Sequence, residues 1–390
     1  MLERLTEGEL PAKHHLMLRG AAGELRHEEC LTRDGFDGPY TILYHVHRPH
    51  ALRATGLAPT AVGVRAAGAD VDHAPMSLQR RHFRSSRAAS TGAPLHARTA
   101  LLFNDDLTLS RVQPNLSDVS YAINADADEL LFIRSGSGIL RTALGDLPYA
   151  PLDYLFVPRG LLYRFELMGD MGHDYLSIAC KRGLDVPPQW RNQRGQLRMD
   201  APYCHRDFRR PTFTGPRDEG IRELAILRND LLYSYQLQSS PLDVVGWDGT
   251  VYPWAFPMLA FQPRVSSVHL PPTWHGTFAA GGALICSFVP RPLDFHPDAI
   301  PCPYPHSNVD IDEVLYYVSG QFTSRAGVGP GSLTLHPRGI PHGPQPGKYE
   351  ASIGATRTDE VAVMLDCQQP LTATRAAAVI EDEGYEASFL

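Results

Sequence analysis

Short runs in which apolar and polar residues alternate, or in which apolar residues follow one another, dominate the chain. Such runs occur at residues 41–46, 130–134, 152–157 and 316–318. Gly, Pro and Asp turns separate the runs at the spacing that is typical of a β-sandwich or β-barrel. Helical periodicity is scarce and predicts helices mainly at two places, Asp218–Leu227 and Thr372–Glu383. We therefore expect a mainly β protein with a few short helices.

The bulk composition narrows the classes of protein. With 390 residues, of which 43% are hydrophobic and 20% charged, the chain is long enough for two globular domains. A net charge of -7 and a pI near 6.2 argue against a nucleic-acid partner. Because we find no signal-like start and no apolar run of about 18 residues, we expect a cytoplasmic protein without a membrane partner. The six cysteines include no C-x-x-C pair, which favours free, mostly buried thiols.

An internal repeat indicates the architecture. Residues 124–136 mirror residues 308–320, with Asn, Asp, Asp-Glu and the final Ser-Gly at matching places. Further on, the Pro-Arg-Gly of residues 158–160 mirrors that of residues 337–339. A repeat of this kind predicts two similar β-barrels in one chain.

The second copy carries a glycine and proline frame around three potential metal ligands. Glu313 lies seven residues before Gly320, and a G-x5-P-x-G-x2-H pattern ends at His342. These two spacings are the two-part signature of the cupin β-barrel. His306, Glu313 and His342 offer two imidazoles and one carboxylate, the ligand set that holds ferrous iron and leaves the opposite face open. We expect a bicupin of two jelly-roll barrels with Fe(2+) in the second.

Two neighbouring residues leave alternatives open for the ligand set. The first cupin motif usually has a second histidine where this chain has Asn308. We interpret Asn308 as a residue beside the metal or the substrate, which leaves three of six octahedral positions free. Asp312 competes with Glu313 for the carboxylate position, although the spacing to Gly320 favours Glu313.

The first copy lacks the ligands. The counterparts of His306 and His342 are Ala122 and Tyr163, so only Glu129 remains. One carboxylate cannot hold a transition metal in competition with water. We therefore expect a degenerate amino-terminal cupin domain at residues 1–185, a connector at 186–220 and a catalytic cupin domain at 221–390.

Several further residues are candidates for catalysis or substrate binding. His269 and His275 flank a loop stiffened by two prolines, and either one suits a general base. His336, six residues before His342, is a candidate for a role beside the metal. Aromatic residues near the motifs, Tyr304 and Phe322 among them, pack in the barrel or face an aromatic substrate.

The carboxy-terminal half resembles the homogentisate 1,2-dioxygenase family. Residues 332–344, Ser-Leu-Thr-Leu-His-Pro-Arg-Gly-Ile-Pro-His-Gly-Pro, look like the family's S-L-H-(x4)-P-H-G-P element. Residues 303–308 are similar to its P-Y-Y-H-R-N element, with Ser307 in place of its arginine. The resemblance covers residues 240–390 well and the first half in general layout. Phe322 stands where the family uses an aromatic hydroxyl near the substrate carboxylate.

This resemblance implies a non-haem Fe(2+) enzyme that opens a hydroquinone ring with O2. The substrate it implies is homogentisate, converted to maleylacetoacetate in tyrosine and phenylalanine catabolism. By the same match His336 contacts substrate and His269 is nearest the catalytic base. It also implies a homo-oligomer, a trimer or hexamer. Other interpretations are a dioxygenase for another hydroquinone such as gentisate, a metal-dependent cupin isomerase, or a small-molecule-binding bicupin.

Overall fold

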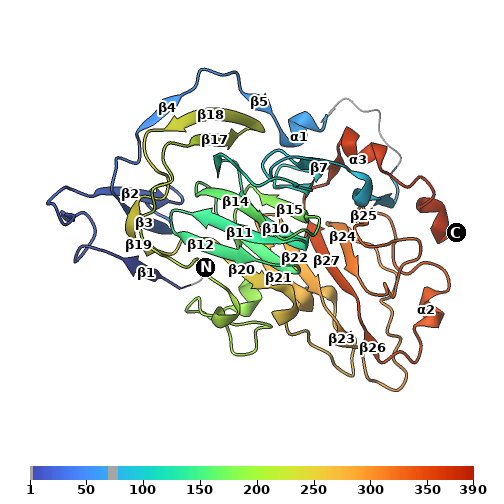
Figure 1. Ribbon diagram of the computed structural model, residues 1–390. Coiled ribbons are helices and arrows are strands. Elements are labelled where there is room, and N and C mark those ends of the chain that lie inside the picture. Colours follow the sequence, from blue (N-terminus) through green and yellow to red (C-terminus); the bar gives the residue numbers. More distant parts are fainter. Residues whose placement is uncertain (1–2, 69–77) are drawn as a thin grey trace.

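The computed structural model describes residues 3–68 and 78–390, which are built mainly of β-strands (Figure 1). Helices in these residues are few and short, so the mainly β class is confirmed. The α-helices are α1 (Gly63–Ala66), α2 (Lys348–Ala351) and α3 (Arg375–Val379). Single 3-10 turns lie at Ser85–Arg87, Pro188–Trp190, His205–Asp207, Met258–Ala260, Pro272–His275 and Glu386–Phe389.

The first barrel is formed by two sheets that face each other. Their inward side chains, such as Leu131, Leu155 and Phe165, form one buried cluster. One sheet contains β20 (Trp254–Pro257), β13 (Asp153–Val157), β10 (Asp128–Ser135), β15 (Asp174–Cys180), β8 (Leu107–Val112), β7 (Arg98–Phe103) and β28 (Thr372–Ala373). The other contains β12 (Gly145–Tyr149), β11 (Ser137–Thr142), β14 (Leu162–Met168), β9 (Tyr121–Asn124), β17 (Glu223–Arg228), β18 (Leu231–Leu237), β4 (Leu52–Ala54) and β5 (Thr60–Ala61).

The second barrel is built on one large sheet, and two smaller sheets complete the molecule. The large sheet contains β16 (Leu184–Asp185), β21 (Gly276–Ala280), β22 (Ala283–Phe288), β27 (Val361–Cys367), β24 (Asp312–Ser319), β25 (Leu333–His336) and β6 (Arg81–Phe83). β23 (Arg291–Pro292) pairs with β26 (Arg357–Thr358). The amino-terminal strands form a sheet of β1 (Leu5–Gly8), β19 (Val244–Gly249), β3 (Tyr40–His45) and β2 (His27–Thr32).

A shared apolar core joins the two barrels. Alternate residues of β10 and β24 face this core, and the Phe132 and Tyr316 ring centroids lie 6.4 Å apart. The Tyr154 hydroxyl meets Ser287 Oγ at 2.9 Å across the same interface. The strands of the two halves accordingly lie against each other in Figure 1, green beside orange. The sheet that contains β10 and the sheet that contains β24 each bury one face in this core. The opposite face of each of these two sheets therefore lines the interior of its own barrel.

Strand pairing crosses between the halves of the sequence. β6 from the first half pairs with β25, and β28 near the carboxyl end pairs with β7. Residues 223–257, which form β17 to β20, pair with strands of the first barrel or the amino-terminal sheet. The expected domain boundaries at residues 185 and 221 stay a prediction.

The helix predicted at Asp218–Leu227 is wrong. Leu224–Leu227 lie in β17, which pairs in parallel with β9 and antiparallel with β18. Pairing on both sides satisfies the backbone polar groups, and this tertiary context outweighs local helical preference. Of the second predicted helix, only α3 forms, because Thr372–Ala373 join the edge of a sheet as β28.

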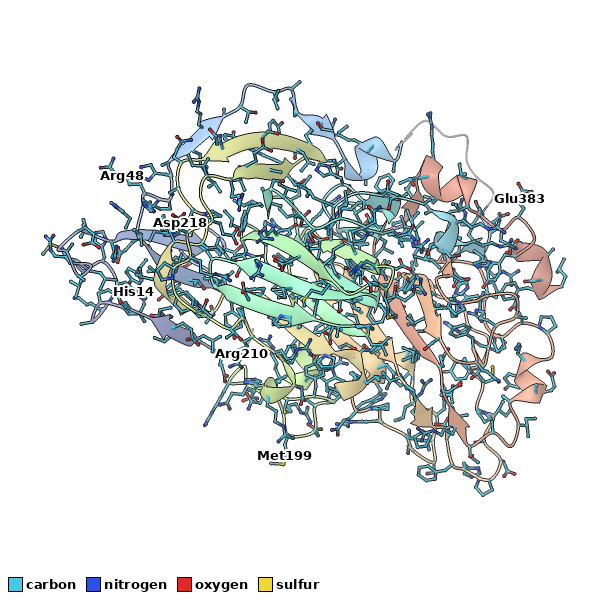
Figure 2. The ribbon with its side chains drawn as sticks, in the orientation of Figure 1. His14, Arg48, Met199, Arg210, Asp218 and Glu383 are labelled. Atoms are coloured by element: carbon cyan, nitrogen blue, oxygen red, sulfur yellow. The ribbon has the colours of Figure 1, made fainter. Side chains whose placement is uncertain are left out.

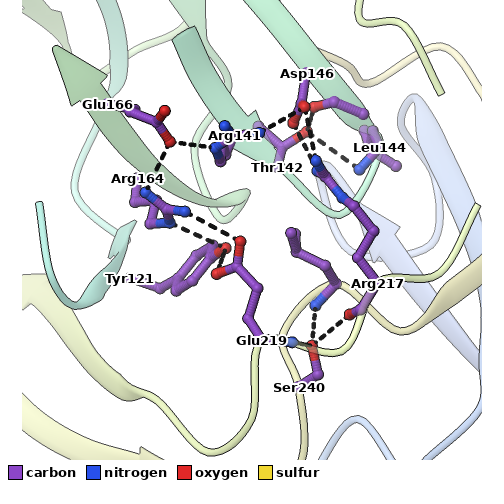
Figure 3. Close-up of polar contacts among 12 residues, drawn as sticks. Tyr121, Arg141, Thr142, Leu144, Asp146, Arg164, Glu166, Arg217, Glu219 and Ser240 are labelled. Carbon is purple, nitrogen blue, oxygen red and sulfur yellow. Dashed lines mark hydrogen bonds and ion pairs between the residues drawn. The ribbon is translucent and has the colours of Figure 1, made fainter. Parts of the chain in front are cut away.

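Ion pairs hold the segment before β17 against the first barrel (Figure 3). Arg217 donates to Asp146 of β12 at 2.7 and 2.8 Å, and Glu219 accepts from Arg164 of β14 at 3.0 Å. The Tyr121 hydroxyl of β9 also donates to Glu219 at 2.8 Å. These contacts hold residues 217–219 against the sheet. Exposed side chains such as Met199 lie at the periphery (Figure 2).

The repeat seen in the sequence is also a repeat in space. His306 pairs with His342 in an isolated antiparallel bridge, and Ala122 pairs with Tyr163 in the same way between β9 and β14. All six cysteines are free, and four of them are buried. The chain is a bicupin.

Candidate metal centre

The backbone brings the two motif histidines together. His306 and His342 exchange two backbone hydrogen bonds of 2.8 Å each, which makes them a directly opposed antiparallel pair. Gly339, in the turn before His342, has a φ of +86°, a conformation that L side chains rarely adopt. Its N–H donates to the Asn308 carbonyl at 2.8 Å, which ties the turn to the first motif. The side chains therefore project to one side, with ring centroids 4.3 Å apart.

Glu313 of β24 completes a group of three potential ligands. Its Oε2 lies 3.9 Å from Nε2 of His306, and its Oε1 lies 3.7 Å from Nε2 of His342. All three donor atoms fall within 4.8 Å of one another. Glu313 and His342 are buried, and His306 is half-buried. The structure thus brings together the three residues that the sequence predicts as ligands.

Hydrogen bonds determine which nitrogen of each imidazole keeps a lone pair for a metal ion. His342 Nδ1 lies 3.0 Å from the Ile340 carbonyl, and His306 Nδ1 lies 3.4 Å from the Tyr304 carbonyl. A carbonyl only accepts, so this arrangement assigns the proton to Nδ1 and the lone pair to Nε2. Nε2 of His342 is buried and has no hydrogen-bond partner among the residues that the structure describes. A buried unpaired acceptor is costly, and a metal ion at this point would satisfy it.

Electrostatics also suit a cation. Burial by itself would raise the pKa of Glu313, but the hydrogen bond from His336 and the charges around it outweigh burial and lower the pKa to about 2. Burial lowers the pKa of His342, which favours the neutral, metal-binding imidazole. An ionised carboxylate with neutral imidazoles is a donor set that fits a divalent transition metal.

His336 lies directly behind the carboxylate. Its Nδ1 is 2.7 Å from Glu313 Oε1, and its Nε2 is 3.2 Å from the Tyr385 hydroxyl. The ring is fully buried and stacks on His342 at 4.9 Å between centroids. Burial lowers the pKa of His336 to about 4, so the network assigns a neutral ring that donates to Glu313 and accepts from Tyr385. Its contact with substrate stays a prediction.

The two candidate bases occupy different environments. His269 is part-exposed, its Nδ1 lies 3.2 Å from Asp294 Oδ2, and its ring is 5.0 Å from that of Tyr304. His275 is buried, and its ring centroid lies 4.8 Å from that of Phe288. Within residues 3–68 and 78–390, its Nδ1 has no hydrogen-bond partner. Burial lowers the pKa of His275 to about 3.

The remaining candidates are spread around the centre. Tyr304 is 53% exposed two residues before His306, whereas Phe322 is buried with its ring 4.7 Å from that of Tyr317. Asn308 is half-buried and holds the Gly339 turn through its backbone. The alternative ligand Asp312 is buried, and its carboxylate accepts from the backbone N–H groups of Arg338 and Leu371 at 2.9 and 2.8 Å. Asp312 therefore stabilises the backbone around the turn before His342. It does not belong to the group of His306, Glu313 and His342.

Sequence reasoning missed three residues near the centre. Tyr385 reaches His336 from the carboxyl-terminal segment, which no motif marks. Asp366 of β27 is the register partner of Glu313, and burial raises its pKa to about 7. Arg325 donates to the carbonyl of Gly343, next to His342, and its buried Nε has no hydrogen-bond partner in the described part of the chain. Strand pairing could have identified Asp366, since it lies on the strand that follows the second motif.

In the first barrel a guanidinium replaces the missing ligands. Arg98 of β7 donates to Glu129 through Nη1, and Ser177 Oγ donates to the same carboxylate at 2.7 Å. Val157 is the register partner of Glu129, as His336 is of Glu313. The first barrel therefore has an ion pair at the position that is equivalent to the three potential ligands of the second barrel.

Comparison with known proteins identifies the family. A family model described as homogentisate 1,2-dioxygenase N-terminal matches residues 107–258. A protein of Saccharolobus solfataricus, named as a candidate dioxygenase, is 34% identical over 386 residues, which are 98% of each chain. The homogentisate 1,2-dioxygenase of Rhizobium rhizogenes is 26% identical over 278 residues, 67% of this chain and 60% of that protein. That of Rhodopseudomonas palustris is 25% identical and covers 66% of this chain. The chain spans about 60% of the length of these two relatives.

Solved structures with a similar arrangement are much more distant in sequence. A mutant of Bacillus subtilis oxalate decarboxylase matches with 10% identity and a TM-score of 0.32, over 78% of this chain and 81% of that one. A cupin barrel protein from Leptotrichia buccalis matches with 11% identity and a TM-score of 0.31, over 70% and 88%. Among the described residues, no helix has the length and apolar character needed to cross a membrane. The close relative that matches almost end to end establishes that the chain belongs to the homogentisate dioxygenase-like family of dioxygenases.

Proposed function

We propose that the protein is an Fe(2+)-dependent dioxygenase that opens the aromatic ring of a hydroquinone. Homogentisate is the first candidate substrate, with maleylacetoacetate as the product. The observation that carries the proposal is the group of His306, Glu313 and His342, whose donor atoms lie within 4.8 Å of one another. Two imidazoles and one carboxylate are the ligand set of non-haem Fe(2+) oxygenases, which keep the other positions open for substrate and O2.

The chain's own residues prepare the site for this chemistry. Iron held by the three ligands would conduct electrons from the bound substrate to O2 and would act as a template that orients the two reactants. Backbone carbonyls hold both imidazoles with Nε2 toward Glu313. His336 and Tyr385 fill the space behind the carboxylate and keep bulk water from that side.

His269 is the residue that we propose as the general base. Asp294 accepts its Nδ1–H at 3.2 Å, so the lone pair on Nε2 is free to take a phenolic proton. Its ring lies beside Tyr304, two residues from the ligand His306, and it is accessible to a substrate. The ring of His275 packs against the rings of Phe261 and Phe288, which suits a structural role.

Another hydroquinone, such as gentisate or a natural-product aromatic, is the second candidate substrate. The observation that favours it is Phe322, a buried ring without a hydroxyl at the position that the resemblance relates to the substrate carboxylate. Tyr304, which is 53% exposed and lies two residues before His306, is a candidate for contact with either substrate.

Oxygen consumption tests the proposal. The protein is loaded with Fe(2+) under anaerobic conditions, and an oxygen electrode then records uptake with homogentisate, gentisate and unsubstituted hydroquinone. We expect one O2 consumed per ring opened, with loss of the aromatic absorbance, and no uptake by the His342→Ala variant. Conversion of substrate without O2 would indicate a metal-dependent isomerase. Ligand binding that is unchanged after removal of the metal would indicate a binding protein.

The resemblance also supports a homo-oligomer, which we propose to be a trimer or a hexamer. Analytical ultracentrifugation of the iron-loaded protein gives the mass directly. A monomer across the micromolar concentration range would contradict this assembly.

A further inference from the structure

A carboxyl group outside the group of three potential ligands lies on the strand next to Glu313. Asp366 of β27 is directly opposite Glu313 of β24 in an antiparallel pair, and β22, β27 and β24 run side by side (Figure 1). Directly opposed residues of such a pair point to the same face of the sheet, with Cβ atoms about 4.5–5.5 Å apart. Asp366 and Glu313 therefore share one face.

That face is the interior of the second barrel. The neighbours of Asp366 along β27, Leu365 and Cys367, are buried in the core that the two barrels share. Because successive side chains of a strand point to opposite faces, Asp366 points away from this core. Met364, on the same face as Asp366, packs with Leu315 in a separate apolar cluster. Asp366 is thus a polar group in the barrel interior, between Glu313 and an apolar wall.

The carboxyl of Asp366 has no partner within the described part of the chain. Neither a hydrogen bond nor an ion pair reaches it there, and its electrostatic environment is set by burial and by the charge of Glu313. The residue is half-buried, and its oxygens keep some accessible surface. A largely enclosed carboxyl without a partner is costly. A ligand in the barrel could therefore reach this group and would relieve that cost.

The first barrel shows that the fold does not need a carboxyl at this position. Glu129 is the residue equivalent to Glu313, and its register partner on β15 is Ala179. The barrel that lacks the histidines therefore has a methyl group where the barrel with the histidines has the carboxyl of Asp366. The carboxyl accordingly goes with the metal centre and not with the packing of the sheet.

The histidines lie on the other side of Glu313. His336 of β25 is the register partner of Glu313 on that side, and its Nδ1 is 2.7 Å from Oε1 of the carboxylate. The ring of His342 stacks on the ring of His336, with centroids 4.9 Å apart. These two imidazoles therefore lie toward β25, whereas Asp366 lies toward β27. A substrate that approaches the centre from the β27 side meets Asp366.

Charge selects the chemical group that Asp366 can bind. A substrate carboxylate beside it would be repelled, so the acidic side chain of a substrate has to lie elsewhere. A ring hydroxyl is neutral and donates its proton to a carboxyl oxygen. An aromatic diol carries two hydroxyls, one for the metal and a second for such a contact.

We propose that Asp366 binds the substrate through a ring hydroxyl, the one that does not go to the metal. This inference rests on the proposed function, because it takes an aromatic diol as the substrate. Asp366 is then a specificity-determining residue. A site built to bond a hydroxyl discriminates against the analogue that lacks it.

Anaerobic calorimetry on the iron-loaded protein tests the proposal with hydroquinone and phenol as probes. Phenol keeps one hydroxyl for the metal and lacks the second. We expect the wild type to bind hydroquinone about tenfold or more tightly than phenol, and Asp366→Ala to bind the two about equally. Asp366→Leu keeps the size of the side chain without its acceptor and gives the same test if the alanine variant fails to fold. Asp298→Asn, which changes an exposed carboxylate, is the control and should keep the wild-type preference.

Two further measurements separate the possible causes. Competition with a chelator should give the same iron affinity for Asp366→Ala and the wild type, because Asp366 is outside the group of three potential ligands. A loss of iron affinity as large as the loss of hydroquinone affinity, or an unchanged preference for hydroquinone in both Asp366 variants, would overturn the proposal. Oxygen uptake by the wild type distinguishes this failure from that of the proposed function. If the wild type opens aromatic diols while the variants keep the preference, only the role of Asp366 is wrong; if it opens none, both proposals fail.

Discussion

Nδ1 of His336 lies 2.7 Å from Oε1 of Glu313, and this contact links the metal centre to the carboxyl-terminal segment. The same imidazole meets the Tyr385 hydroxyl at 3.2 Å through its other nitrogen. A hydrogen bond to a ligating carboxylate orients it and tunes its basicity. His336 is thus placed to support Glu313, whereas the sequence resemblance predicts that it contacts the substrate.

The His336→Gln variant is expected to bind Fe(2+) about 10–100-fold more weakly, the usual cost of losing a partner of a metal ligand. Competition with a chelator measures the dissociation constant, and circular dichroism checks the fold. Tyr385→Phe is the matched control and should cost less, because it leaves the Glu313 contact intact. Unchanged iron affinity with a higher KM would show that His336 acts on the substrate instead.

Loss of a ligand should be more severe. His342→Ala removes one of three protein donors, so we expect iron binding and turnover to disappear together. Metal analysis after gel filtration gives the iron content, and oxygen uptake gives the rate. Turnover near the wild-type rate in metal-free protein would contradict the assigned centre.

Matched variants can show which of the two loop histidines, His269 or His275, is the general base. His269→Gln should lower kcat by about 10²–10⁴-fold while iron remains bound, which is the range for loss of a general base. His275→Leu should keep most of the activity, because His275 is buried against Phe288. The reverse order of effects would assign the base to His275.

The Arg98–Glu129 ion pair of the first barrel makes a prediction about stability. Arg98→Met leaves Glu129 as a buried, unpaired charge and should lower the free energy of unfolding by about 3–5 kcal/mol. Arg98→Met/Glu129→Leu removes both charges and should recover most of this loss. Chemical denaturation of the three proteins measures both effects. Equal stability of the single and double variants would show that an unpaired Glu129 costs little.

His45 gives the protein a stability that depends on pH. Burial opposes protonation, but hydrogen bonds to Asp243 at 2.7 Å and Glu29 at 3.0 Å outweigh burial and raise the pKa of His45 to about 9. The ordinary pKa is near 6.5, so the folded state holds this proton more tightly than the unfolded state. The stabilisation is therefore complete below pH 6.5 and is lost as the pH rises through 9.

Its size is at most about 3 kcal/mol, from the difference between the two pKa values. Unfolding curves of the wild type and His45→Asn between pH 6 and pH 10 test this, and the gap in stability should shrink with rising pH. His47→Asn is the control, because His47 also meets Asp243 but is 55% exposed and should matter less. A gap that stays constant over this range would contradict the assigned ion pair.

Some features follow from sequence alone because they depend on local spacing. The Gly and Pro frame of residues 331–342 predicts the turn before His342, and Gly339 with its positive φ is the clearest element of that turn. The repeat of this frame predicts the two barrels, and the missing histidines at Ala122 and Tyr163 predict which barrel lacks a metal centre. The ligand group of His306, Glu313 and His342 could be found in this way.

Contacts between distant segments could not be found in the same way. Residues 223–228 form a strand only because β9 and β18 supply partners on both sides, and Tyr385 reaches His336 from 49 residues away. Likewise, Arg98 of β7 meets Glu129 of β10 although β8 and β15 lie between these strands in the sheet, and no pattern along the chain marks the pair. The sequence determined the two barrels and the three candidate ligands, because these depend on local backbone geometry. The tertiary structure alone decided what surrounds each carboxylate, because non-local pairing sets those neighbours.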